Sequence, residues 1–69
     1  MDRVKLRIQE LADAKGWTLQ EVTNRSSLPY ETVQDYSQNI LSAVDLSVVY
    51  KIARALEVTL EDLVEVLEN

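Results

Sequence analysis

The sequence predicts an all-α fold in which five short helices form one compact domain, residues 1–69. Three observations lead to this prediction. Apolar residues recur at spacings of three and four along most of the chain, as they do on the buried face of a helix. Three of the apolar runs follow good N-cap residues, which are Thr18, Asp45 and Thr59. The single glycine and the single proline fall between runs, where helices end and begin.

The first helix is expected from about Val4 to Lys15, and Gly16 then ends it because glycine readily adopts a positive φ. The residues on its apolar face are Val4, Ile8, Leu11 and Ala12. The start of this segment also alternates apolar and basic residues, which is the periodicity of a strand, over Val4, Lys5, Leu6, Arg7 and Ile8. Because the apolar pattern continues to Leu11 at helical spacing, we interpret the whole segment as a helix.

The second helix, about Leu19 to Arg25, begins with a capping box. Thr18 is the N-cap and Glu21 follows three residues later, so their side chains can satisfy backbone N–H groups at the helix start. The residues that follow this helix form a tight turn of Ser26, Ser27 and Leu28.

The third helix, Tyr30 to Ser37, begins after Pro29, whose fixed φ suits the first turn of a helix. Its inward residues are Val33 and Tyr36, and we interpret Tyr36 as part of the core. Two short amphipathic helices joined by a tight turn form a helix-turn-helix. This unit spans about residues 18–37.

Residues 37–45 form the longest connection and lead to the fourth helix, Leu46 to Leu56, which Asp45 caps. Thr59 caps a fifth helix, whose apolar face is formed by Leu60, Leu63, Val64 and Leu67. The stripes of all five helices predict a core that includes Leu11, Val22, Val33, Ile52 and Leu63.

The residue inventory excludes several classes of chemistry. The chain has no Cys and no His, which removes disulfides, the usual zinc sites and the commonest catalytic base. A site of carboxylates alone stays open, but so small a domain rarely encloses the ~300 Å³ that a small ligand needs. We therefore expect no enzyme, no catalytic residue, no cofactor, no metal and no small-molecule substrate. Because no signal peptide or membrane-spanning stretch is visible, we expect a cytoplasmic protein.

The formal net charge of −5 is unusual for a nucleic-acid-binding domain, which is normally basic. The excess of acid lies in residues 57–69, which hold five acids and no base: Glu57, Glu61, Asp62, Glu65 and Glu68. The rest of the chain is neutral. A solvated helix face is our interpretation of the acidic end.

Two stretches of the chain resemble the Cro and lambda-repressor-like family, often called the XRE family. They are IQELADAKGWTLQEVTNRSSLPYETVQDY and LSVVYKIARALEVTLEDLVEV. The resemblance covers nearly the whole chain and implies the lambda-repressor-like helix-turn-helix fold. It also implies a transcriptional regulator that binds double-stranded DNA in a sequence-specific manner, usually as a dimer on an inverted repeat.

The resemblance places DNA contacts at the start of the second helix, along the third and in the loop after it. The corresponding residues are Gln20, Tyr30, Glu31, Thr32, Gln34, Ser37, Gln38 and Asn39. Gln20 and Gln34 suit this role, because Gln can pair with two groups of an adenine. Thr32 and Tyr30 can contact phosphate oxygens or a thymine methyl group.

The chain departs from the family pattern in charge and in glycine content. Family members often have Gly where this chain has Ser27, Asn39 and Glu57. They are usually basic near the end of the third helix and in the next loop, where this chain has Asp35, Gln38, Ile40 and Leu41. Four bases, which either border the DNA or are ordinary solvated charges, are Arg3, Lys5, Arg7 and Arg25.

DNA binding is the leading function, and a protein-interaction module is the alternative. In that alternative the helix-turn-helix is a scaffold, as in a DNA mimic, an antirepressor or a resurfaced domain, and does not bind DNA. The candidate protein interface consists of Ile40, Leu41 and Val66, because apolar surface on a small domain usually marks an interface. We also expect a homodimer formed through the last helix or through residues 37–45. A purely structural bundle would leave the resemblance unexplained.

Overall fold

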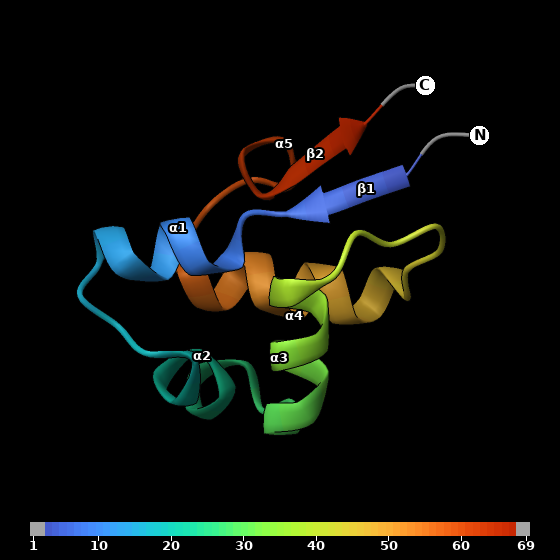
Figure 1. Cartoon of the computed structure of the whole chain (residues 1–69). Coiled ribbons are helices and arrows are strands. Elements are labelled where there is room, and N and C mark those ends of the chain that lie inside the picture. The colour runs from blue at the N-terminus through green and yellow to red at the C-terminus, as the bar shows by residue number, and fades with distance from the viewer. Residues whose placement is uncertain (1–2, 68–69) are drawn as a thin grey trace.

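Helices form the body of the molecule, and strands from the two ends of the chain pair beside it (Figure 1). The structure, a computed structural model, describes residues 3–67. Along the chain they form β1 (Arg3–Leu6), α1 (Ile8–Ala14), α2 (Leu19–Ser26), α3 (Tyr30–Gln38), α4 (Leu46–Leu56), α5 (Leu60–Leu63) and β2 (Val64–Leu67). The five expected helices are therefore present in the described chain. The prediction of a strictly all-α fold is wrong, because β1 and β2 form a small antiparallel sheet.

β1 corrects the expectation of a helix beginning near Val4. The alternation of apolar and basic residues in this segment is that of a true strand, with the Leu6 side chain fully buried. The Arg7 amide donates to the Leu63 carbonyl at an N···O distance of 2.9 Å, and α1 starts only at Ile8. The pairing partner comes from the other end of the chain, so local periodicity alone could not reveal it.

β2 corrects the length of the fifth helix. Thr59 does cap α5, because its hydroxyl accepts a hydrogen bond from the Asp62 amide at 3.1 Å. The helix then ends after one turn, and Val64 already has the extended angles φ −99° and ψ 126°. The β-branched residues of this segment pair with β1 in the register Leu6 with Val64 and Val4 with Val66.

Leu41 attaches the connection after α3 to the outer edge of β1. Its amide and carbonyl groups exchange hydrogen bonds with those of Val4, each at 2.8 Å, in an isolated antiparallel bridge. Leu41 is partly buried and packs against the core. This contact explains an aliphatic residue in a connection that was expected to be wet.

The core lies between the helices and one end of the sheet. Its fully buried larger side chains are Leu6, Ile8, Val22, Val33, Ile52, Leu56 and Leu63. Four of the five predicted core residues are thus confirmed, while Leu11 is only partly buried and packs against the others. Tyr36 is also partly buried, and its hydroxyl accepts a hydrogen bond from the Asp45 amide at 3.0 Å.

Left-handed backbone conformations end three of the helices. Gly16 has φ 73°, Ser27 has φ 61° and Glu57 has φ 60°. Glycine adopts this conformation at no steric cost, which accounts for the family preference for Gly at the last two positions. Asn39 has φ −113°, so the third departure has a different explanation: this helix ends in extended backbone.

Candidate nucleic-acid interface

α3 presents the polar surface that the helix-turn-helix would place against DNA. Pro29, at φ −61° and ψ 145°, precedes its first turn and directs the chain into the helix. Val33 is buried and Tyr36 is partly buried against the core, so these two residues mark the inward face of α3. The predicted contact residues of this segment are exposed at Tyr30, Glu31, Gln38 and Asn39 and partly buried at Thr32, Gln34 and Ser37.

Several polar side chains on this surface are already engaged with neighbouring residues. The Gln20 amide donates to Asn24 Oδ1 at 3.1 Å, and the Ser37 hydroxyl donates to the Gln34 carbonyl at 2.9 Å. Asn39 Nδ2 donates to the Asp35 carboxylate. Among residues 3–67, the side-chain amide of Gln34 makes no hydrogen bond. The same is true of Gln38, so Gln34 and Gln38 are the predicted contact residues whose side-chain amides are available to a partner within the described part of the chain.

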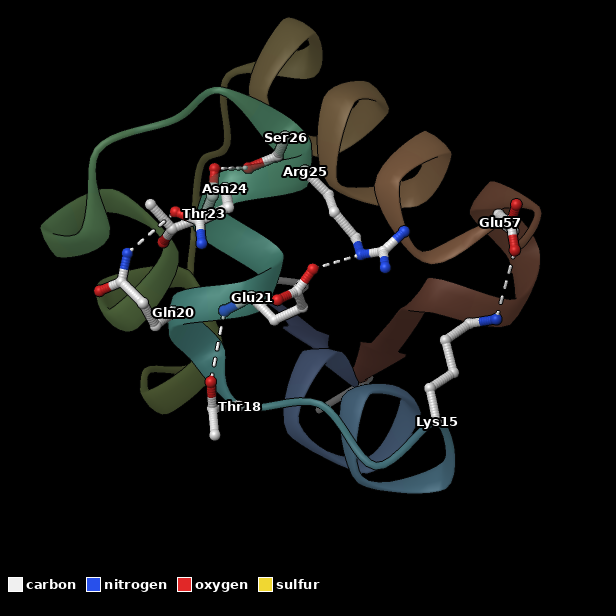
Figure 2. A network of polar contacts seen from close by, with 9 residues as sticks. All are labelled: Lys15, Thr18, Gln20, Glu21, Thr23, Asn24, Arg25, Ser26 and Glu57. Atoms are coloured by element: carbon white, nitrogen blue, oxygen red, sulfur yellow. Dashed lines mark hydrogen bonds and ion pairs between the residues drawn. The ribbon is translucent and has the colours of Figure 1, made fainter.

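α2 has neutral amide side chains on one side and charged side chains on the other. Figure 2 shows Gln20 and Asn24 on the side toward α3 and Arg25 on the opposite side. The Nε of Arg25 pairs with Glu21 Oε2 at 2.7 Å, and its guanidinium lies 4.0 Å from the centre of the Trp17 ring. The base nearest to α3 in the sequence is thus directed away from that helix.

The helix-turn-helix formed by α2 and α3 agrees with a family match that covers nearly the whole sequence. Residues 7–68 match the family model of the Cro/C1-type HTH DNA-binding domain. The chain belongs to this family. Searches of curated proteins and of solved structures gave no match. The match begins after β1, so this strand lies outside the part of the chain aligned with the Cro/C1-type domain.

The remaining candidate bases of this Cro/C1-type domain lie on β1 and just before α1. Arg3 and Lys5 are exposed on β1. Arg7 is partly buried and donates through Nη2 to the carbonyl of Asp62, which ties the start of α1 to α5. The four bases considered above therefore belong to different parts of the surface, and the sequence contains no Lys or Arg between Arg25 and Lys51.

A basic hollow between α2 and α4 is the feature that sequence reasoning missed. Its volume is about 300 Å³, and its lining residues are Arg25, Ser26, Lys51, Arg54 and Ala55. We expected no hollow of this size in so small a domain. The available signal was the spacing of Lys51 and Arg54, which places both bases on one face of α4.

The three residues of the candidate protein interface come together at the sheet. Leu41 bridges Val4 on one side, Val66 pairs with Val4 on the other, and Ile40 adjoins Leu41 in the chain. Ile40 and Val66 are 52% and 56% exposed. Val66 is exposed because it lies on a strand near the end of the sheet.

The part of the chain that the structure describes contains no cluster of acids that could hold a metal ion. Nor does any helix within residues 3–67 have the length and apolar character needed to cross a membrane. Among the acids, Asp45 stands out: hydrogen bonds from the side chain and the backbone amide of Ser47 lower the pKa of its carboxyl group. This carboxylate is the N-cap of α4.

Proposed function

We propose that this domain is a transcriptional regulator that reads double-stranded DNA with α3 in the major groove. Membership of the Cro/C1-type family carries the proposal, because that family binds DNA. The position of α3 supports it: α3 follows α2, which Thr18 caps, and a tight turn, and its polar surface is accessible.

Gln34 is the main base-reading residue in this proposal. Its side-chain amide has no partner among residues 3–67, and a Gln amide can donate to N7 and accept from N6 of one adenine. Gln20 is a second reader, although it must first give up its hydrogen bond to Asn24. The residues that contact the sugar–phosphate backbone are then Tyr30, Thr32, Ser37, Gln38 and Asn39.

The acids on α3 affect both the strength of non-specific DNA binding and its dependence on salt. Glu31 and Asp35 are exposed and face the phosphate field, which repels them. Glu31 can accept a hydrogen bond from N4 of a cytosine, and Asp35 is already hydrogen-bonded to Asn39. Binding is therefore weak on arbitrary sequences and depends on correct base contacts, with a shallow dependence on salt.

The competing function is a protein-interaction module that does not bind DNA. Two observations favour it: α3 has no base, and Ile40 and Val66 are both exposed in segments that flank β1, one on each side of that strand. The partner in this case is a second copy of the chain. Within residues 3–67, β2 makes strand hydrogen bonds only with β1, so its second edge is available to a copy.

A selection from random duplex DNA at low salt, followed by fluorescence anisotropy on the enriched sequence, tests the two functions. We compare the natural chain with Glu31→Gln/Asp35→Gln and with the matched control Glu61→Gln/Glu65→Gln, which removes the same charge from α5 and β2. Stronger non-specific binding by the α3 variant alone supports reading through α3. No enrichment and no binding at low salt by any of the three proteins would reject the DNA function.

A further inference from the structure

Three of the seven bases of this acidic chain line one hollow. Arg25 comes from the last turn of α2, and Lys51 and Arg54 come from α4. The hollow has a volume of about 300 Å³, which is the lower end of the range for small-molecule sites. It is shallow and broadly open to solvent, so a ligand can enter without a change in the fold.

Arg25 is held in place before any ligand binds, whereas exposed Arg54 only lies near an aromatic ring. Glu21 and the Trp17 ring fix Arg25 through Nε and through the face of its guanidinium. Figure 2 shows the Nη atoms of Arg25 directed away from Glu21. The guanidinium of Arg54 lies 5.7 Å from the centre of the Tyr50 ring. A preorganised guanidinium group such as that of Arg25 loses little entropy when it binds an oxyanion.

The protein balances only part of the positive charge at the hollow. Glu21 pairs with Arg25, but no ion pair among residues 3–67 involves Lys51 or Arg54. Arg54 lies in the last turn of its helix, where a base is favourable in any case. Lys51 interacts electrostatically with the Asp45 carboxylate at the start of the helix, and it also lies one turn from Arg54 on the same face, where like charges repel. An anion between them would remove that repulsion.

We propose that this hollow binds the phosphate group of a small molecule. A phosphate carries enough charge and enough oxygens to engage two guanidinium groups and one ammonium at once, whereas a single carboxylate would neutralise one. The ligand is a second partner, separate from the DNA of the proposed function. Arg25 and the α3-facing residue Gln20 project from opposite sides of α2 (Figure 2).

Amide NMR titrations of the full chain test this inference. The probes are inorganic phosphate, ribose 5-phosphate and, as the form without phosphate, ribose, at an ionic strength held constant with chloride. We expect saturable shifts at residues 25–26 and 51–55 with the two phosphates and none with ribose. Shifts that do not saturate, or that spread over all the bases, would overturn the proposal. Ribose 5-phosphate carries a sugar that inorganic phosphate lacks. Tighter binding of the ester therefore indicates a phosphate-ester site, and tighter binding of inorganic phosphate indicates a free-phosphate site.

Matched variants separate this site from general electrostatics and from DNA binding. Lys51→Gln should weaken phosphate binding by about tenfold, which is the loss of one charged hydrogen bond. Lys5→Gln removes the same charge from exposed β1 and should leave the affinity unchanged. Equal weakening by both variants would overturn the proposal. So would a short DNA duplex that shifts residues 25–26 and 51–55 when neither phosphate does, because the hollow would then be part of a nucleic-acid surface. Gln34→Ala, in contrast, should not affect phosphate binding.

Discussion

The backbone groups of Val4 and Leu41 exchange two hydrogen bonds of 2.8 Å each. This bridge connects the segment that follows α3 to a strand at the start of the chain. It holds Leu41 against the core and leaves the neighbouring Ile40 52% exposed. The side of the molecule on which we expect self-association is therefore built from both ends of the chain and from the loop after α3.

We predict a homodimer that uses this side of the molecule. Ile40→Glu and Val66→Glu should each weaken the dimer, because each places a charge in apolar surface that the second copy would bury. Tyr50→Glu, at a side chain of similar exposure on α4, is the control. A two-fold axis beside β2 would bring Glu65 and the α5 acids of the two copies together, so the dimer should tighten as salt screens them. Sedimentation showing a monomer at near-millimolar concentration, in both low and high salt, would refute it.

Truncation of the core should cost most where burial is complete. Ile52→Ala and Leu63→Ala remove side chains with no exposed surface, and each should lower the free energy of unfolding by about 2–5 kcal/mol. Leu11→Ala should cost less, because Leu11 is only partly buried. Urea denaturation followed by circular dichroism measures all three. A larger loss at Leu11 than at Ile52 would contradict the packing described above.

Glycine should stabilise the chain at its two left-handed positions. Ser27→Gly and Glu57→Gly relieve backbone strain that exceeds the entropic cost of glycine, so each should raise the free energy of unfolding by roughly 0.5–1 kcal/mol. Glu57→Ala is the control: it keeps the strain and removes only the exposed ion pair with Lys15, which contributes little. Thermal unfolding that ranks Glu57→Ala above Glu57→Gly would exclude this explanation.

The cap of α4 should make stability depend on pH in the acid range. Hydrogen bonds from Ser47 lower the pKa of Asp45 below its usual 3.8 in the folded state. The stabilisation is therefore complete above about pH 3.8 and is lost as the pH falls through the lower, folded-state pKa. Asp45→Asn keeps a good cap but cannot titrate, so it should flatten this part of the stability curve. Urea midpoints measured at several acid pH values would show parallel curves for both proteins if the cap were unimportant.

Specific DNA binding should depend on Gln34 more than on any other residue of α3. Gln34→Ala should cost about 1–3 kcal/mol on the selected sequence and relax the preference at one base pair. Gln38→Ala, at an exposed residue near the helix end, should weaken all sequences alike if it contacts only the backbone. Anisotropy with single-base variants of the duplex separates these effects. Unchanged preference in Gln34→Ala would mean that another element reads the DNA.

The helices were predictable because their signals are local. Thr18, Asp45 and Thr59 cap the helices that they were expected to cap, and the stripe of α4 is its buried face. The strands were not predictable in the same way, although Val4 and Leu6 showed the alternation of a strand. Each strand is stable only because the other lies opposite it, and a pairing between the two ends of the chain leaves no local signal.

The candidate site shows the same division. Membership of the family follows from the order and spacing of motifs, so it could be predicted from the residues alone. The side from which Arg25 projects could not, because its interaction with Trp17 depends on how α2 packs. The hollow requires α2 and α4 to lie together, which no stretch of sequence specifies.

Because Arg3 pairs with Leu67, the first and the last described residues lie next to each other on one side of the molecule. A domain fused at either strand would therefore lie on the far side of the molecule from the first residues of α3 (Figure 1). The pairing of β1 with β2 also bears on the order in which the elements fold during synthesis. β1 is synthesised before β2, so it has no strand to pair with until β2 has been made. The helix-turn-helix can form meanwhile, and we expect β1 and β2 to pair after it.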